Sequence, residues 1–448
     1  MIRKTVDYVV VGSGPGGATL VRELARAGKQ VLLLERGRDW RGHPLYATYP
    51  GALLYADRYA LLFSREGLNI VRPLMLGGAT GMYCGCAAMP LPFWKQKHGI
   101  DLDAHARATY DELKIAPLPA HLRGEASTRI AHAGAELGMD WQAQDKFMQP
   151  ALAKSFDCSA TCMLGCRCGA KWNAAQYVDA AVVDGCELWT RARVDRVDIV
   201  QNRATGVSGH IGNKPFEITA NTVILAAGGI GTTHILQASG LDAAGQGMAM
   251  DTTAMVYGVA PTKGIGADPP MTWSYADDDL GVLYSTLIDP WLMYPLIMAT
   301  KGPTYPLSWR NWGRTYGIMI KLKDDISGSI DKSGISKGLT TRDRARLSSA
   351  EQIARDILQR AGCDPTSFLT TPLRGTHPSA TVRISEMVTT DLETSVADLY
   401  VCDASVFPEA LARPTVITII ALAKRLALHL TTATTKPEDL RRLRELVG

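Results

Sequence analysis

The fold of this chain is decided by the stretch VDYVVVGSGPGGATLVRELARAGKQVLLLE, residues 6–35. Residues 6–11 are short, β-branched and followed by glycine, which is typical of a buried parallel strand. A helix with one apolar face is expected next and ends near Gly28, and residues 30–34 predict a second strand that ends at Glu35. The order strand, glycine turn, helix and strand predicts a Rossmann-like α/β domain.

The turn after the first strand carries the G-x-G-x-x-G pattern at Gly12, Gly14 and Gly17. Gly12 permits the tight turn, Gly14 lets the backbone approach a pyrophosphate, and Gly17 lets the helix pack closely on the strand. The helix N-terminus offers N–H groups to phosphates. Glu35, about 20 residues further on, can accept hydrogen bonds from ribose hydroxyls. The pattern predicts a dinucleotide site but does not distinguish FAD from NAD.

Length and composition exclude several classes of protein. The chain has 448 residues, of which 46% are hydrophobic and 21% charged, so it is neither disordered nor collagen-like. Its formal net charge of +4 is too small to indicate a nucleic-acid partner. We expect no transmembrane segment, because no apolar run is long enough to span a bilayer. The first residues do not form a signal peptide, which predicts a cytoplasmic protein.

Two further regions predict strands of the same domain. Residues 188–200 and 203–211 predict paired strands around a turn at Gln201-Asn202. Residues 222–226 predict another buried strand, which runs into the glycine turn at residues 228–231 and a helix. A large flavin fold closes its nucleotide site with such a returning strand and glycine turn.

At these residues the chain resembles the glucose–methanol–choline (GMC) oxidoreductases. VILAAGGIGTTHILQASG (223–240) is similar to the second nucleotide-fold signature of that family, and LGGAT (76–80) resembles its early glycine loop. HPSAT (377–381) is similar to its His-x-x-Gly-Thr motif. DLYVCDASVFP (398–408) resembles its "NLYVVDASVFP" strand and turn, and residues 414–430 resemble its closing helix. The matches run in family order through nearly the whole chain, with residues 255–320 as the exception.

The resemblance implies an α/β (α+β) fold in which a Rossmann-like FAD-binding domain is interleaved with a substrate domain built on an antiparallel sheet. We expect the FAD-binding domain to comprise residues 1–100, 150–255 and 390–448, and the substrate or cap domain residues 101–149 and 256–389. The resemblance implies non-covalent FAD, because Gly81, Met82 and Tyr83 fill the positions where some relatives attach the flavin.

Carried over position by position, the resemblance also implies a cofactor site. In it, Glu35 binds the adenosine ribose, Val194 contacts adenine, and Asp403 faces the ribityl chain and pyrophosphate. The N-terminus of the last helix points at the flavin pyrimidine ring. The full set of implied cofactor residues is Gly12, Gly14, Gly17, Glu35, Gly77, Gly78, Thr80, Val194, Gly228 and Asp403.

Two residues are candidates for catalysis. His377 lies on the motif that resembles the family's catalytic one, and an imidazole with a pKa near about 6.5 can take the proton of an alcohol. Arg413 lies where the family places a second His or Asn. Arginine stays cationic and cannot act as a base, so Arg413 would hold a carboxylate or stabilise an alkoxide or enolate, or else cap a surface loop. Together with Ala380, which replaces the motif glycine, it leaves room for carbonyl or alkene chemistry.

Four cysteines, Cys158, Cys162, Cys166 and Cys168, fall within one short segment with the spacing C-x3-C-x3-C-x-C. Gly165 and Gly169 favour a loop over a regular helix. Four thiolates can hold an iron–sulfur cluster or zinc, and some GMC dehydrogenases carry a cluster in a similar stretch. The alternatives are thiols that are free or joined in disulfides. A cluster would pass electrons singly to an acceptor protein or quinone.

The region 270–317 is rich in Trp, Tyr and Met. It predicts either an aromatic-packed sheet with a lid, or an apolar substrate pocket. Within it, residues 291–298 are too few to span a bilayer but could rest on a membrane or partner.

The function that this sequence favours is an FAD-dependent dehydrogenase that oxidises the CH–OH group of a fairly apolar substrate by hydride transfer to flavin N5. Electrons would leave through a cluster or a diffusible acceptor. Two alternatives stay open. One is a flavin-dependent reductase or desaturase of C=C or C=O groups, with Arg413 polarising an oxygen. The other is a flavin-carrying electron-transfer subunit without turnover of its own.

Overall fold

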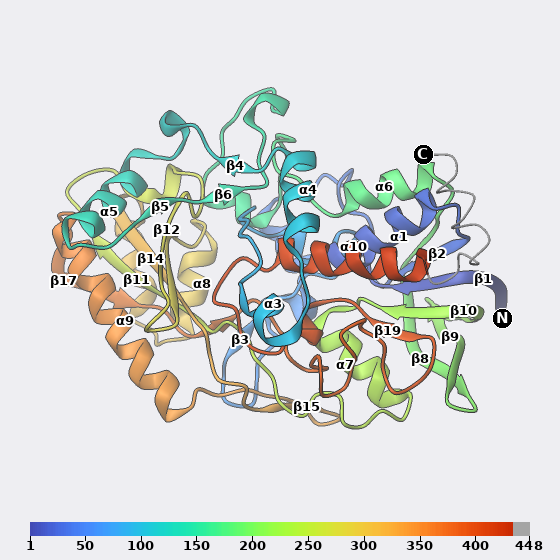
Figure 1. Cartoon of the computed structure of the whole chain (residues 1–448). Coiled ribbons are helices and arrows are strands. Elements are labelled where there is room, and N and C mark those ends of the chain that lie inside the picture. The colour runs from blue at the N-terminus through green and yellow to red at the C-terminus, as the bar shows by residue number, and fades with distance from the viewer. Residues whose placement is uncertain (433–448) are drawn as a thin grey trace.

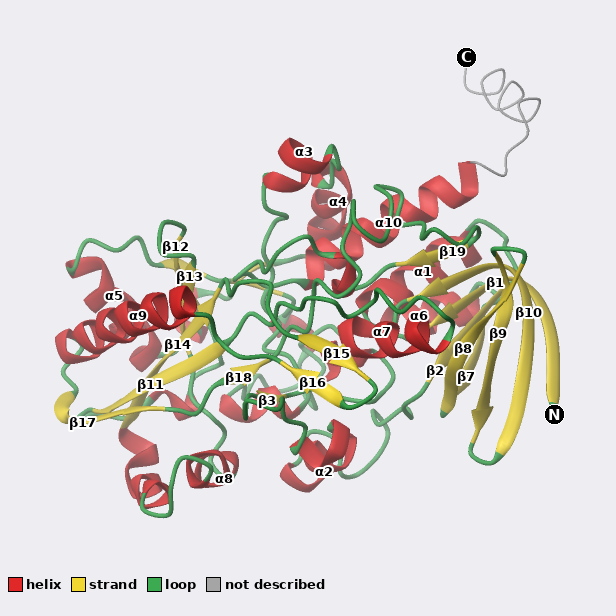
Figure 2. Ribbon diagram, turned by 90° about the horizontal axis from the view of Figure 1, so that it is seen from below, coloured by secondary structure: helices red, strands yellow, loops and turns green. Residues whose placement is uncertain are grey.

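A computed structural model describes residues 1–432 of the chain. Two β-sheets lie at opposite ends of the molecule, and loops and short helices fill the space between them (Figure 2). Each sheet has a hydrophobic core of its own. This mixed α/β architecture confirms the expected fold class.

The first sheet has seven strands in the order β7-β2-β1-β10-β9-β8, with β19 on β10. Strand β1 is parallel to β2 and β10, and β10 is parallel to β19 but antiparallel to β9. The strands are β1 (Ile2–Val11), β2 (Val31–Glu35), β7 (Glu187–Thr190), β8 (Ala192–Val200), β9 (Arg203–Ile211), β10 (Lys214–Leu225) and β19 (Leu399–Val401).

The helices of this half include segments from both ends of the chain. Helix α10 packs along α1, so the red C-terminal helix lies beside the blue N-terminal one (Figure 1). The helices of this half are α1 (Pro15–Arg26), α3 (Phe93–His98), α4 (Asp103–Leu113), α6 (Ala175–Val183), α7 (Gly228–Ala238) and α10 (Val416–Thr432).

The second sheet is mostly antiparallel and follows the order β3-β18-β11-β14-β13-β12-β5, with β17 on β11. Helix α9 packs on β14 and β11, and α5 lies beside α9. The strands are β3 (Asn69–Ile70), β5 (Gln142–Ala143), β11 (Thr253–Val259), β12 (Trp273–Asp277), β13 (Val282–Thr286), β14 (Thr315–Leu322), β17 (Asp364–Thr370) and β18 (Arg374–Gly375). The helices are α5 (Glu125–Glu136) and α9 (Thr341–Arg360).

The remaining elements are short. They are the strand pairs β4 (Ala116–Pro117) with β6 (Asp145–Lys146) and β15 (Ser329–Asp331) with β16 (Gly334–Ser336), and helices α2 (Tyr49–Tyr55) and α8 (Met293–Ala299). Short 3-10 helices span Asp57–Ala60, Gly78–Gly81, Ala120–Leu122, Pro150–Leu152, Ala160–Leu164, Ile265–Ala267, Tyr305–Arg314 and Ala404–Val406.

Two elements differ from the sequence prediction. Strand β1 begins at Ile2, four residues before the predicted start. The sequence did not indicate this part of the strand, because residues 2–5 alternate between exposed and half-buried positions and lack the apolar run of the second half. The strand predicted over 188–200 is two strands, β7 and β8, since Arg191 adopts a left-handed φ of 58° between them.

The chain passes several times between the two halves, as an interleaved organisation requires. The exact boundaries remain a prediction. Strand β3 pairs with β18 of the second sheet although residues 1–100 were assigned to the first domain. Helix α4 packs on α10 although residues 101–149 were assigned to the second. Within residues 1–432, no helix is long and apolar enough to cross a membrane.

Candidate active site

A cavity of about 1310 Å³ lies between the two halves. One part of its wall comes from the glycine turn after β1, including Gly12 and Gly14, and another from Met319 and Lys321 of β14. Cavities that hold one small ligand usually measure about 300–1,000 Å³. The cavity therefore has room for a dinucleotide and a second small molecule.

The glycine turn is shaped by backbone contacts that only glycine allows. Gly12 has φ 103°, and a Cβ atom there would lie 2.3 Å from the carbonyl oxygen of Ala226. A Cβ atom at Gly17 would lie 1.8 Å from the Gly12 carbonyl oxygen. Gly14 has open space in that direction, lines the cavity, and precedes α1 without a side-chain cap. The first N–H groups of α1 are thus available to a ligand phosphate.

Glu35 ties this turn to the next strand. Its Oε2 atom accepts hydrogen bonds from Ser13 N at 2.9 Å and Ser13 Oγ at 2.6 Å, and its Oε1 atom accepts from Gly37 N at 2.6 Å. The side chain is buried but lines the cavity. Glu35 therefore braces the glycine turn and also lines the cavity.

The second glycine loop packs directly on the first. Gly77 N donates to Ser13 Oγ at 3.0 Å, and a Cβ atom at Gly78 would lie 2.9 Å from Gly14 Cα. Thr80 is buried, with Oγ1 donating to Gly77 O at 2.6 Å and accepting from Ala174 N at 2.8 Å. Gly78, Thr80 and Val194 line the cavity, whereas Gly77 and Gly17 lie behind its wall.

Asp403, just after β19, forms hydrogen bonds to the segment that follows β10. Its Oδ2 atom accepts from Gly228 N at 2.8 Å and Thr232 Oγ1 at 2.6 Å, and its Oδ1 atom accepts from Ser405 N at 2.8 Å. Gly228 adopts φ 76°, where glycine is favoured. Both residues line the cavity, so the second nucleotide-fold signature and the C-terminal strand and turn meet at its wall.

His377 and Asp251 form a buried pair at the cavity. Asp251 Oδ2 lies 2.8 Å from His377 Nδ1, and Asp251 Oδ1 accepts from Ala412 N at 2.8 Å. Because a carboxylate only accepts, Nδ1 carries the proton and Nε2 keeps a lone pair. Burial, and next the Lys321 ammonium, lower the pKa of His377 below its usual range, against the opposing effect of Asp251. The imidazole is thus unprotonated at neutral pH, and its Nε2 can accept a proton.

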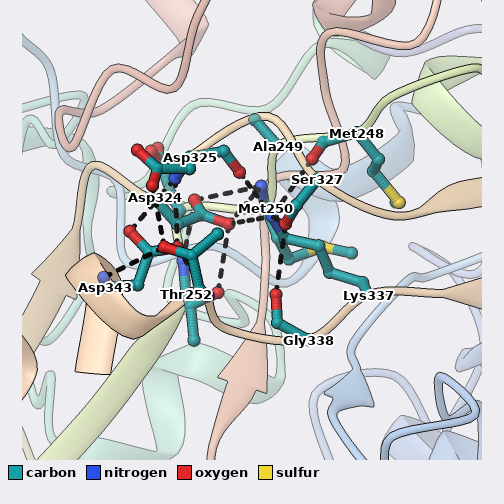
Figure 3. Close-up of polar contacts among 12 residues, drawn as sticks. Met248, Ala249, Met250, Thr252, Asp324, Asp325, Ser327, Lys337, Gly338 and Asp343 are labelled. Atoms are coloured by element: carbon teal, nitrogen blue, oxygen red, sulfur yellow. Dashed lines mark hydrogen bonds and ion pairs between the residues drawn. The ribbon is translucent and has the colours of Figure 1, made fainter.

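Asp251 is held in place by a second carboxylate. Asp251 has a left-handed φ of 49°. Asp324 accepts from the backbone N–H groups on either side of it, those of Met250 at 3.2 Å and Thr252 at 3.4 Å. Asp324 in turn pairs with Lys337 at 2.7 Å, and neither side chain is exposed to solvent (Figure 3). This ion pair fixes the turn that presents Asp251 to His377.

Comparisons with known proteins agree with this arrangement. Residues 74–266 and 338–423 match the N- and C-terminal models of GMC oxidoreductase. The chain belongs to the GMC oxidoreductase family. Residues 10–66 also match an NAD(P)-binding Rossmann-like domain.

Several relatives of this GMC oxidoreductase are similar over long stretches. An uncharacterised GMC-type oxidoreductase of Mycobacterium tuberculosis is 30% identical over 277 residues, which is 56% of this chain and 42% of the relative. The chain thus spans less than half of that relative's length. An uncharacterised protein of Methanocaldococcus jannaschii is 28% identical over 94% of this chain and 98% of its own. The long-chain-alcohol oxidase FAO4B of Arabidopsis thaliana is 24% identical over 80% of this chain and 52% of its own.

The fold matches a solved structure. The crystal structure of pyridoxine 4-oxidase from Mesorbium loti superposes with a TM-score of 0.68, covers 95% of this chain and 99% of its own, and shares 17% sequence identity. At that identity the match establishes the shared fold.

The residues of this GMC oxidoreductase fit FAD, the cofactor of the family. The turn at Gly14 leaves backbone N–H groups without a side-chain cap, and Glu35 lies at the end of β2, where its carboxylate would accept hydrogen bonds from the ribose of a bound FAD. Thr415 and Val416, at the start of α10, also line the cavity. The positive end of that helix dipole therefore faces the cavity, where it favours negative charge.

Replacing Gly17 by alanine is expected to lower FAD retention and to destabilise the fold by about 1–3 kcal/mol, the usual cost of overpacking. The added methyl group would collide with the Gly12 carbonyl and push α1 away from the turn. Flavin content after purification and the urea midpoint measure both effects. Gly42→Ala is the matched control, because a Cβ atom there meets nothing within 4 Å. Equal flavin content in the two variants would contradict the prediction.

Arg413 does not reach His377. Its Nη2 atom donates to Asp278 at 2.5 Å, its Nη1 atom donates to Ala412 O at 3.1 Å, and it is not among the residues that line the cavity. Its partner Asp278 is strongly exposed. The guanidinium thus holds a surface loop, which was the structural alternative for this residue, while the neighbouring Pro414 and Thr415 face the cavity.

The cysteine segment does not form the expected metal centre. It folds as a 3-10 helix at Ala160–Leu164 and a loop. Its thiols lie in pairs, with Cys158 hydrogen-bonded to Cys162, and Cys166 Sγ 3.7 Å from Cys168 Sγ. That hydrogen bond lowers the pKa of Cys162 to about 6. In the described part of the chain, no three His, Cys, Asp or Glu side chains are arranged to hold a metal ion. The iron–sulfur expectation is therefore not supported, because the sulfur donors do not converge.

Sequence reasoning missed Asp251, Lys321 and the Asp324–Lys337 pair. Asp251 lies 126 residues before His377, and nothing near it forms a motif. The one local signal was the run KLKDD at residues 321–325, whose first lysine falls inside an otherwise apolar strand. A charged residue within such a strand is an early sign of a functional side chain.

Proposed function

We propose that this chain is an FAD-dependent oxidoreductase that oxidises the CH–OH group of a fairly apolar alcohol. The observation that carries the proposal is the His377–Asp251 pair. Its imidazole, with Nε2 unprotonated, lines the same cavity as the dinucleotide-type glycine turn. The alcohol oxidase named among the relatives supports the substrate class.

Bound FAD would supply the acceptor for the hydride that leaves the alcohol carbon. The chain's own residues handle the proton and the position of the substrate. His377 Nε2 accepts the hydroxyl proton, and Asp251 stabilises the imidazolium that results. The buried carboxylate also fixes the tautomer that leaves Nε2 unprotonated.

The apolar part of the substrate would lie against a wall rich in methionine and aliphatic side chains. They include Met163, Met255, Met271, Leu287, Met293, Leu296, Ile297 and Met319. Helix α8 supplies three of them, so part of the aromatic-rich region 270–317 lines the cavity. Tyr257 stacks on Tyr294, with ring centroids 5.3 Å apart, and anchors that helix on the sheet.

The other two functions have less support. The reductase alternative relied on Arg413 to polarise an oxygen, and its guanidinium binds Asp278 instead. The electron-transfer alternative needs no base for a substrate proton, whereas the buried His377–Asp251 pair supplies one at the cavity. Because the cysteine thiols within residues 1–432 do not converge on a metal, we propose a diffusible acceptor, such as a quinone, for the electrons.

The test is anaerobic reduction of the purified, flavin-loaded protein by a panel of primary alcohols, such as 1-octanol, benzyl alcohol, pyridoxine and choline. Bleaching of the visible flavin band by an apolar member supports the proposal. Full flavin occupancy with no bleaching by any member would overturn it and favour the electron-transfer subunit.

The rate of flavin reduction should depend on pH through His377. Burial and the Lys321 ammonium lower its pKa, so the imidazole remains unprotonated below its ordinary value of about 6.5. The rate should be maximal above the lowered pKa and should fall as pH drops through it. A pH series of single-turnover reduction measures this limb. An acid limb centred above about 6.5 would contradict the prediction.

A further inference from the structure

Lys321 is a buried cation that the fold leaves without a strong acceptor. It lies near the end of β14, has 4% of its surface exposed, and lines the cavity. Its Nζ atom lies 3.4 Å from His377 Nδ1 and 3.5 Å from Thr376 Oγ1. Among residues 1–432, no carboxylate oxygen comes within 4.0 Å of it.

The other buried lysines are bound much more tightly. Lys146 donates to Cys84 O at 2.7 Å and to Pro270 O at 2.8 Å. Lys171 donates to Tyr83 O and Cys162 O, both at 2.6 Å. Lys337 pairs with Asp324 at 2.7 Å. A buried ammonium without such partners is costly, so the exception at Lys321 points to an acceptor that arrives with a ligand.

His377 cannot be that acceptor. Its Nδ1 atom already donates its proton to Asp251 at 2.8 Å, so the 3.4 Å approach of Lys321 is an electrostatic contact and not a hydrogen bond. Thr376 Oγ1, at 3.5 Å, is at the limit of hydrogen-bond distance. The ammonium therefore has donor capacity to spare beside the imidazole.

The residues on the sheet face around Lys321 indicate which kind of ligand would fit there. Lys321 pairs in register with Thr253, and Met319 with Met255, and all four line the cavity. One cation thus lies at the edge of an apolar wall, next to a base. A ligand with an apolar body and one electron-rich oxygen matches this surface, and an alcohol that is losing its proton is such a ligand.

We propose that Lys321 donates a hydrogen bond to the substrate oxygen that His377 deprotonates, and so stabilises the negative charge that grows on that oxygen. This inference rests on the proposed function. The hydroxyl proton moves to His377 Nε2, the C–O bond becomes a carbonyl as the hydride leaves, and Lys321 keeps all of its protons. Before the substrate binds, the same ammonium keeps the imidazole unprotonated by like-charge repulsion.

The test uses three variants of the flavin-loaded protein. Lys321→Met removes the charge, Lys321→Arg keeps it, and Lys323→Met is the matched control. Lys323 lies two residues further on, pairs with Glu409 at 2.9 Å and does not line the cavity. Flavin content is measured first, so that any loss of FAD is detected separately.

The first measurement is octanoate binding by isothermal titration calorimetry, because its carboxylate mimics an anionic substrate oxygen and cannot be oxidised. We expect Lys321→Met to weaken binding at least tenfold, and Lys321→Arg and Lys323→Met to stay within a few-fold of the unmodified protein. Unchanged octanoate affinity in Lys321→Met would overturn the inference. This result is independent of whether any alcohol is oxidised.

The second measurement is anaerobic flavin reduction by 1-octanol over a range of pH. Loss of one donor to a developing oxyanion should slow the reaction by about 10²-fold or more in Lys321→Met. Burial lowers the pKa of Lys321, and Asp251 opposes the shift. Rates should therefore fall at alkaline pH, as the ammonium loses its proton, and Lys321→Arg should abolish that limb because arginine stays charged.

The possible failures are distinguishable. If the unmodified protein is reduced by no alcohol but binds octanoate through Lys321, the proposed function fails and the oxygen site stands. If the unmodified protein is reduced and Lys321→Met matches it in rate and alkaline limb, the proposed function stands and Lys321 has no catalytic role. If Lys321→Met loses FAD, the comparison of Lys321→Arg with the unmodified protein decides through the alkaline limb alone.

Discussion

Replacing His377 by asparagine should slow anaerobic flavin reduction by a reactive alcohol by about 10³-fold, within the range of general-base contributions. Asparagine cannot take up the hydroxyl proton, whereas His377 Nε2 can, because Nδ1 is committed to Asp251. FAD should stay bound, since none of the contacts that shape the glycine turn involves His377. Stopped-flow absorbance at saturating alcohol measures the rate.

The chain offers a matched control for this prediction. His210 also pairs with an aspartate, with Nδ1 2.9 Å from Asp195 Oδ2, but it lies half-exposed on β9 and outside the cavity. His210→Asn should reduce its flavin at the rate of the unmodified protein. If His377→Asn keeps both its FAD and its full rate, His377 is not the base and the proposed mechanism is wrong.

Replacing Lys337 by methionine should destabilise the protein by about 3–5 kcal/mol, because it leaves the Asp324 carboxylate buried without a counter-charge. Lys337 is completely buried, and it also donates to Asp325 O at 2.7 Å and Ser327 Oγ at 3.0 Å. The loss should be largest at the turn that Asp324 holds. Urea unfolding gives the free energy, and hydrogen exchange at the amides of Met250 and Thr252 locates it.

Two further variants make this prediction specific. Lys332→Met changes an exposed lysine of the same β15–β16 hairpin and should leave the urea midpoint unchanged. The double variant Asp324→Asn with Lys337→Met removes both charges and leaves an amide oxygen that can still accept from the backbone. It should regain part of the stability lost in Lys337→Met. A double variant less stable than the single one would show that the pair acts by packing rather than by charge.

The two largest effects are connected through Asp251. The Asp324–Lys337 pair holds the left-handed turn at Asp251, and Asp251 orients His377. A variant that loosens the turn should therefore impair catalysis as well as stability, even though Lys337 does not line the cavity. Residues that hold a catalytic group in position through another residue commonly affect both activity and stability.

The dinucleotide half of the site could be predicted because its determinants are local. Gly12, Gly14, Gly17 and Glu35 lie within one strand–turn–helix–strand unit, and backbone sterics alone require glycine at such a turn. The same holds for Gly228 and for the motif that carries His377. Each is a short segment in which residue type and spacing already specify the backbone.

The substrate half could not be predicted, because its residues come together only in three dimensions. Asp251 and Lys321 come from segments separate from the motif that carries His377, and neither lies in a motif of its own. Similarly, no spacing indicates that Arg413 pairs with the distant Asp278 and so leaves the cavity. The four closely spaced cysteines were a strong local pattern, but the loop directs their sulfurs into pairs.

The sequence by itself thus determined the nucleotide-binding fold, because turn sterics and hydrophobic patterning act over a few tens of residues. The tertiary structure alone decided which charges face the cavity. Burial makes the energy of each charged group depend on partners from other segments, such as Asp251 for His377, 126 residues apart, and only the packed fold selects those partners.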